Sequence, residues 1–110
     1  VMKRDDRVSR MAVANLLKLV IPFNAPHGFH LVALNKDEVR IELPNSKLNR
    51  NHVNGVHACA IATLGEFCAG LTLARHLGLT RYRFLLAKLQ VDYHKQGRTK
   101  LTGIARLSED

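Results

Sequence analysis

The sequence has no tryptophan and only four phenylalanines and two tyrosines among its 110 residues. Proteins that bind single-stranded nucleic acid stack the bases on aromatic side chains, so this scarcity argues against such a partner. Basic residues outnumber acidic ones by 17 to 9 and give a formal net charge of +8, but they are spread along the chain. The charge therefore suits an anionic small ligand or a solvated surface, and we expect no nucleic-acid partner.

Cysteine is scarce as well. Cys59 and Cys68 are nine residues apart, and on a helix that spacing places them about 180° apart, so they cannot pair with each other. We interpret them as reduced thiols of a cytoplasmic protein. The charged N-terminus is not followed by the apolar core of a signal peptide. Neither a metal-ligand spacing nor a glycine-rich phosphate loop is present, so we expect no metal.

A long uncharged apolar run is also missing. Residues 58–74 come closest, but the run has 17 residues and contains Glu66. A membrane-spanning helix needs roughly 20 apolar residues with few or no charges. We therefore expect a buried helix and no membrane partner.

The length predicts a single domain over residues 1–110. An amphipathic helix is expected over residues 5–20, then a proline-containing loop over 21–29, and two strands within 30–44 that are joined by a turn at 35–37. A central helix over 56–77 ends at Gly78, and a hairpin follows, with strands at 81–95 and 99–107 joined by a turn at 96–98. This order predicts an α+β fold in which an antiparallel sheet packs on one dominant helix.

The central helix raises a question about its one carboxylate. At 100° per residue, Ile61, Leu64, Cys68 and Leu71 share one face, whereas Glu66 lies opposite among small residues. A helix that is apolar nearly all round should be buried nearly all round, so the small face suggests contact with a second subunit. Glu66 is then a structural carboxylate paired with an arginine, a carboxylate exposed at an open helix edge, or a general base or nucleophile tuned by its setting.

The preceding loop favours the last interpretation. The chain enters the helix through Asn54-Gly55-Val56-His57, where the first-turn amides have no partner within the helix and can bind a carbonyl oxygen or a developing oxyanion. Asn51 stands six residues before His57, and Glu66 stands nine after it.

This spacing resembles the signature of the hotdog-fold thioesterase superfamily, which includes PaaI-like enzymes and an uncharacterised DUF4442-type branch. In that signature an Asn precedes His-Gly-Gly, and an Asp or Glu follows nine residues after the His. The resemblance covers about residues 28–107 and implies a hotdog fold, a sheet wrapped around a long helix, with an additional N-terminal helix here. It also implies hydrolysis of an acyl-CoA or similar thioester by a homodimer or homotetramer, with no cofactor other than the coenzyme A of the substrate.

Carried over to this chain, the resemblance makes Glu66 the general base or nucleophile and the N–H of Ala58 the group that polarises the thioester carbonyl. Asn51 would position the carbonyl or the attacking water, and His57 begins the helix beside them. The residues expected to contact the substrate are Gly55, Cys59, Thr63, Lys95 and Arg98, the last two at the phosphates of coenzyme A.

The sequence departs from the family pattern in two respects. His-Gly-Gly is replaced by His57-Ala58-Cys59, which adds side chains where the substrate approaches, and the last strand or strands of the domain are not apparent. A non-catalytic acyl-binding or structural role therefore stays open. So does a hotdog hydratase or dehydratase using His52, fourteen residues before Glu66. His57 could equally be a helix cap, and Cys59 a small packing residue.

Overall fold

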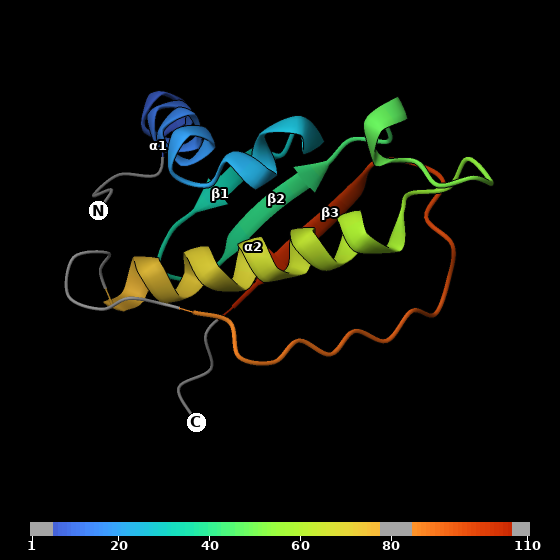
Figure 1. Cartoon of the computed structure of the whole chain (residues 1–110). Helices are drawn as coiled ribbons and strands as arrows, with labels where there is room; N and C mark the ends of the chain where they lie inside the picture. The colour runs from blue at the N-terminus through green and yellow to red at the C-terminus, as the bar shows by residue number, and fades with distance from the viewer. Residues whose placement is uncertain (1–5, 78–84, 107–110) are drawn as a thin grey trace.

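The computed structural model describes residues 6–77 and 85–106. Over these residues the elements are α1 (Arg7–Val20), η1 (Pro22–His27), β1 (His30–Leu34), β2 (Val39–Leu43), η2 (Lys47–Asn49), α2 (Ala58–Leu77) and β3 (Leu101–Ala105). Both predicted α-helices are confirmed, and each begins two residues later than expected. The fold is α+β, as the sequence predicts (Figure 1).

The segment before the sheet is more ordered than the predicted loop. Asp6 is the N-cap of helix α1: its carboxylate accepts a hydrogen bond from the N–H of Ser9 at 2.7 Å and so satisfies an orphan amide. The prediction of a loop over residues 21–29 is wrong for most of its length, because residues 22–27 form the 3₁₀-helix η1. Proline at its first position favours this start, and Gly28, at φ 70°, ends it in the left-handed conformation.

Strands β1 and β2 form the predicted antiparallel hairpin, in which Leu34 faces Val39 and His30 faces Glu42. The side-chain oxygen of Asn35 closes the turn by accepting hydrogen bonds from the N–H groups of Asp37 and Glu38. Alternate residues of β2 are buried, as the sequence pattern predicts, and they form the middle of the core.

The predicted second hairpin is wrong. Residues 101–105 do form a strand, but β3 pairs antiparallel with β2, with Ile41 facing Gly103, and the sheet order is β1-β2-β3. Residues 85–100 are extended and belong to no ladder, and the expected strand residues 81–84 lie outside the described range. A period-two pattern marks a segment that can form a strand, but it does not specify the partner.

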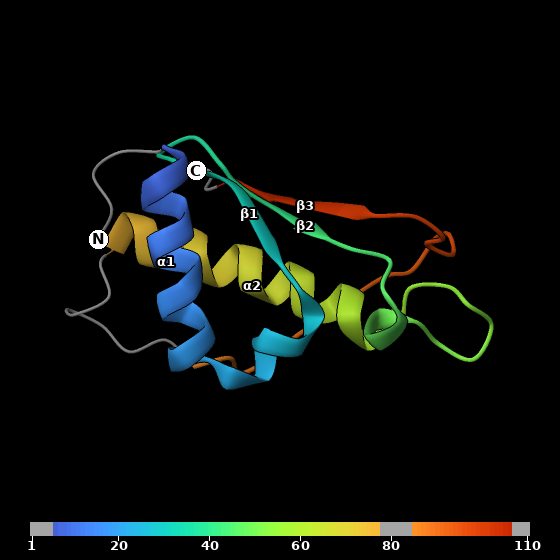
Figure 2. The same cartoon turned by 90° about the horizontal axis from the view of Figure 1, so that it is seen from above.

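Helix α2 covers one face of this sheet, and α1 crosses the molecule near the β1 edge (Figures 1 and 2). The buried core is formed by Leu31, Leu34, Val39, Ile41, Leu43, Val56, Ala60, Leu64, Cys68 and Leu71. The residues placed together on the helical wheel are confirmed, with Leu64, Cys68 and Leu71 buried and Ile61 partly buried against them.

The other side of α2 differs from the prediction. Within the described chain this helix is not buried all round, because Cys59, Gly65, Ala69 and Leu73 are exposed and Glu66 is half-buried. By length and composition alone α2 could span a membrane, yet its larger apolar side chains pack against β2 and β3. The small-residue face lies open.

Candidate functional site

The loop before α2 is held in one shape by its own polar groups. The side-chain oxygen of Asn51 accepts hydrogen bonds from the N–H groups of Val53 and Gly55, each at 3.0 Å. Asn54 adopts a left-handed conformation at φ 62°, which asparagine tolerates better than most residues. Asn51 therefore shapes the turn through its oxygen, while its NH₂ group makes no hydrogen bond to any described residue.

His57 caps α2 in two ways. Its carbonyl accepts hydrogen bonds from the N–H groups of Ala60 and Ile61, and its ring Nδ1 accepts one from the N–H of Cys59 at 3.0 Å. The alternative role of His57 as a helix cap is thus what the geometry shows, with Nδ1 unprotonated. The N–H of Ala58 is left without a hydrogen bond to the described residues, as expected for the first residue of a helix.

A cleft of about 360 Å³ opens at the start of α2, and Ala58 is one of the residues that line it. We call it the helix-start cleft; it is lined by Asn51, Val56, Ala58, Ile61 and residues 93–97. The extended segment that follows α2 in the chain returns beside it and forms the opposite wall (Figure 1). The Tyr93 hydroxyl donates a hydrogen bond to the carbonyl of Ala58 at 2.8 Å and so fixes this wall against the helix start.

A second hollow of about 410 Å³ adjoins the cleft and shares Ile61 and residues 93–97 with it. Arg98 lines this hollow, and Lys95 lines both. Arg98 donates a hydrogen bond to the side-chain oxygen of Gln96 at 2.7 Å. Of the two cations expected at the phosphates of a substrate, Lys95 therefore lines the same cleft as Ala58, and Arg98 lines the adjoining hollow.

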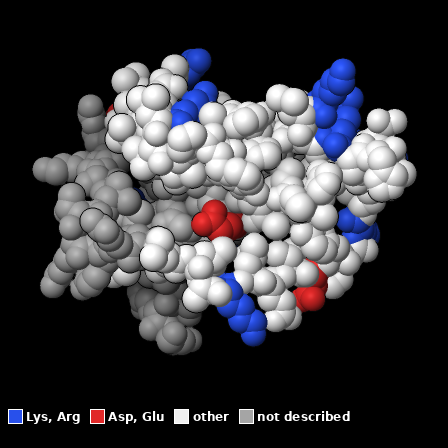
Figure 3. All heavy atoms as spheres, viewed as in Figure 1, with Lys and Arg blue, Asp and Glu red and all other residues white. Residues whose placement is uncertain are grey.

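Glu66 lies elsewhere on the helix. It is eight residues after Ala58, about 12 Å along the axis and about 80° around it, and it does not line the helix-start cleft. It forms no ion pair or hydrogen bond with any described residue, so the arginine-paired alternative is absent from this part of the chain. Figure 3 shows acidic surface near the middle of this face, with basic groups towards its margins.

The other predicted contact residues are scattered along the same helix and loop. Thr63 donates its hydroxyl to the Cys59 carbonyl at 2.8 Å, and Cys59 itself is exposed. Gly55 is buried, and the side chain of Gln96 occupies the space that a Cβ would need there. Among the described residues no group of three metal-binding side chains exists.

Sequence reasoning missed Tyr93, His94 and Gln96 as cleft residues, because they were assigned to a strand and turn of a hairpin. It also missed Asn49, which is fully buried. The carbonyl of Asn49 accepts a hydrogen bond from the N–H of His57 at 2.7 Å and so supports the start of α2. The number of asparagines in this loop was the one sequence signal that a buried asparagine supports the start of α2.

The folded chain is similar to two solved structures. The crystal structure of "genomics APC5556" matches with a TM-score of 0.76 and 18% identity, over 88% of this chain and 65% of that one. PA5026 from Pseudomonas aeruginosa, described as a protein of unknown function and "probable thioesterase", matches with a TM-score of 0.71 and 22% identity, over 89% and 66%. This chain thus spans about two thirds of the length of either structure.

These likenesses place the α+β architecture in the hotdog class. No curated protein matches the sequence. The family model named "Domain of unknown function (DUF4442)" matches residues 9–110. The chain belongs to the DUF4442 family.

Proposed function

We propose that this protein is a thioesterase of the hotdog class that hydrolyses an acyl-CoA or a similar thioester. The observation that carries the proposal is Ala58, whose N–H group at the start of α2 has no partner among the described residues and which lines a cleft together with Lys95. Such an N–H group is suited to a carbonyl oxygen that becomes negatively charged during attack. The PA5026 description points to the same class of reaction in a protein of similar fold.

In the proposed reaction the Glu66 carboxylate removes a proton from water as the water oxygen attacks the thioester carbon. The N–H of Ala58 stabilises the oxyanion, and the NH₂ group of Asn51 is available to orient the carbonyl. Collapse of the intermediate breaks the carbon–sulfur bond, and Glu66 returns its proton to the departing sulfur, so that the acid and the thiol of coenzyme A are released and the carboxylate is regenerated. Lys95 and Arg98 would hold the phosphates of that leaving group, so no further cofactor is required.

The separation of about 12 Å between Ala58 and Glu66 on one helix is too large for both to act on one carbonyl. We therefore infer that a complete site contains Ala58 from one copy and Glu66 from another. Two α2 helices that lie antiparallel through their small-residue faces would bring these groups together, twice in each dimer. This arrangement accounts for an open helix face made of Gly65, Ala69 and their small neighbours.

The alternative dehydratase chemistry has less support. His52 lies in the loop before α2 and is therefore further from Glu66 along the chain than Ala58 is. Its ring is exposed and lines neither of the two hollows described above.

The test combines two variants that each remove one group. Glu66→Gln should lower turnover of a panel of acyl-CoAs by about 10²–10⁴-fold, the range for a general base. Ala58→Pro should lower it by about 10²–10³-fold, because it removes the oxyanion donor, while proline is tolerated at the first helical position. Co-expressed with different tags and purified as a mixed dimer, the two variants should regain activity, because one of the two sites then has both groups intact.

Val53→Ala is the matched control, since it changes an exposed residue of the loop before the same helix and leaves both groups in place. It should keep near wild-type turnover. Wild-type protein without thioesterase activity on the panel, or Glu66→Gln with unchanged turnover, would overturn the proposal and favour a non-catalytic acyl-binding role. Loss of activity in both variants without recovery in the mixed dimer would contradict the two-copy site alone.

A further inference from the structure

Helix α1 and the beginning of β1 enclose a hollow that the proposed reaction does not use. Its volume is about 340 Å³, close to that of the helix-start cleft, and the two share no lining residue. We call it the α1–β1 hollow. It is lined by Arg7, Arg10, Met11, Ala14, Asn15, Lys18, Phe29, His30 and Leu31.

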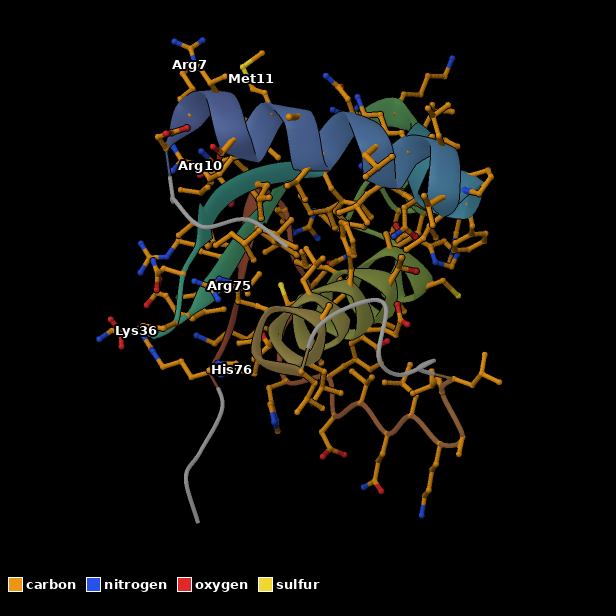
Figure 4. All side chains as sticks on the ribbon, turned by 90° about the vertical axis from the view of Figure 1, so that its left-hand side faces the viewer. Arg7, Arg10, Met11, Lys36, Arg75 and His76 are labelled. Atoms are coloured by element: carbon orange, nitrogen blue, oxygen red, sulfur yellow. The ribbon has the colours of Figure 1, made fainter. Side chains whose placement is uncertain are left out.

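The spacing of these residues explains why one side of α1 forms a wall of the hollow. Taking Arg7 as 0° and advancing 100° per residue, the α1 residues that line it fall within about 140° of one another. The core-packing residues Val13 and Leu17 lie next to this side, at about 240° and about 280°. Figure 4 shows Arg10 on the side of α1 nearer to β1 and Arg7 and Met11 on the side away from the sheet. Arg10 is accordingly half-buried, whereas Arg7 and Met11 are exposed at the rim.

The lining of the hollow is strongly positive. Arg7, Arg10 and Lys18 contribute cations, and no Asp or Glu is among the described residues that line it. Both arginines lie near the start of α1, where the helix dipole favours anions over cations. An anion in the hollow would therefore reduce the repulsion among these groups and interact favourably with the start of the helix.

A smaller space continues from the hollow towards α2. This inner pocket has a volume of about 20 Å³, which is room for one water-sized group. It shares Ala14, Lys18, Phe29 and Leu31 with the hollow, and its lining is completed by Leu17, Asn24 and Phe67. Lys18 therefore stands where the two spaces meet.

Asn24 is the polar group at the inner end of this path. It is only 8% exposed, and its side-chain amide makes no hydrogen bond to any described residue. Its backbone N–H, by contrast, donates to the carbonyl of Ile21 at 3.1 Å. Buried amides nearly always have partners, because an unsatisfied one is unfavourable. Asn24 thus offers a hydrogen-bond donor and an acceptor that a ligand in the inner pocket can use.

We propose that the α1–β1 hollow binds a phosphate monoester with a short apolar body. The phosphate lies among the cations of α1, because guanidinium groups match phosphate oxygens in geometry and a dianion suits several cations. The apolar body lies on Phe29 and Leu31, and a hydroxyl or carbonyl group at its end bonds to the amide of Asn24. A free inorganic anion would leave the apolar lining and this amide unused. The inference is independent of the proposed thioesterase activity.

Isothermal titration calorimetry with three kinds of probe separates the parts of such a ligand. Short ω-hydroxyalkyl phosphates carry all the proposed groups, the matching alkyl phosphates lack the hydroxyl group, and inorganic phosphate lacks the apolar body as well. We expect one of the hydroxyalkyl phosphates to bind most tightly, its alkyl counterpart to bind less tightly and inorganic phosphate to bind least.

Three substitutions then assign the binding to this hollow. Lys18→Gln should lower the affinity for the hydroxyalkyl phosphate about tenfold or more, the ratio for one lost charge-assisted hydrogen bond. Lys36→Gln removes the same charge at the exposed turn between β1 and β2 and should leave the affinity unchanged. Asn24→Leu should abolish the preference for the hydroxyalkyl over the alkyl phosphate. Its unfolding free energy in urea should be no lower than that of wild type, because the amide has no protein partner to lose.

The proposal is overturned if no ester binds more tightly than inorganic phosphate, or if Asn24→Leu keeps the preference for the hydroxyl group. It is also overturned if Lys18→Gln and Lys36→Gln weaken binding equally, which would indicate a general attraction to the net charge. Both lysines are exposed, so neither substitution should disturb folding, and a loss of binding confined to Lys18→Gln reports on the hollow itself.

Discussion

The side chain of Asn49 connects three segments that lead into the candidate site. Its NH₂ group donates hydrogen bonds to the carbonyls of His27 and Pro44 and to the hydroxyl of Ser46, and its oxygen contacts Nδ1 of His27 at 2.9 Å. These bonds join η1, the end of β2 and η2 at the point where the chain turns towards α2. A buried amide with all its bonds made is favourable, and removing it would leave several groups without partners.

The two cysteines differ in burial, because they lie on opposite faces of α2: Cys68 is buried and Cys59 is exposed. Cys68 is 2% exposed, and burial raises the pKa of its thiol from about 9.0 to about 11, although a backbone hydrogen bond at Ile41 lowers it slightly. In the unfolded chain the thiol ionises above about pH 9, whereas in the folded chain it keeps its proton up to about pH 11. Stability should therefore fall as the pH rises through this interval.

We predict that wild-type protein loses about 1.4 kcal/mol of unfolding free energy per pH unit from this thiol between about pH 9 and 11. Urea denaturation of wild type and Cys68→Ala at several pH values measures it, because the two proteins differ only in this side chain. Cys59→Ala is the control, because that thiol is exposed and its variant should follow the wild-type curve. Parallel curves for wild type and Cys68→Ala would show that the thiol does not keep its proton on folding.

At the scale of elements, the contact between β3 and α2 depends on a residue without a side chain. A Cβ on Gly103 would lie 2.9 Å from Sγ of Cys68 and 2.9 Å from Cγ of Leu64. Real Cβ atoms do not approach other atoms so closely, so the strand can lie this near the helix only with glycine at this position. Overpacking of this kind typically costs about 1–3 kcal/mol.

Gly103→Ala should accordingly lower the unfolding free energy by about 1–3 kcal/mol, as measured by urea denaturation. Adding Cys68→Ala should recover part of the loss, because it removes one of the two close atoms, so the effects of the two substitutions should not add. Thr102→Ala, at an exposed position of the same strand, should change stability by less than about 0.5 kcal/mol. Additive costs for Gly103→Ala and Cys68→Ala would contradict a direct contact between these residues.

The elements that sequence predicted correctly are those specified by neighbouring residues. Both helices follow from the spacing of their apolar residues, and the β1–β2 hairpin follows from alternation and the turn at residues 35–37, signals that lie within a few residues of one another. The pairing of β3 with β2 was missed. These two strands are about sixty residues apart in the sequence, so their pairing depends on how the intervening helix packs and not on neighbouring residues. Within the candidate site, the loop and the start of α2 were predictable, whereas Tyr93 reaches Ala58 only through the tertiary path of the chain.

For the molecule as a whole, residues 85–95 and β3 leave backbone and apolar groups exposed. Leu85 is 92% exposed, and Leu86, Leu89 and Tyr93 of the same extended segment are exposed too. Within the described chain, β3 pairs with β2 on one side and has no strand on its other side. An unpaired edge and an apolar extended segment are surfaces on which strands of another chain can pair.

We predict that the protein associates with itself through these surfaces and that Leu85→Lys combined with Leu89→Lys weakens the association at least tenfold in sedimentation velocity. Hydrogen exchange gives the sharper criterion, because amides of residues 85–95 have no ladder partner among the described residues and should exchange quickly when the protein is dilute. Protection of these amides should grow with protein concentration in wild type, stay low in the double variant, and be unaffected by Leu48→Lys on η2. Protection that is already complete in the dilute monomer would show that the segment pairs within a single chain and would contradict this prediction.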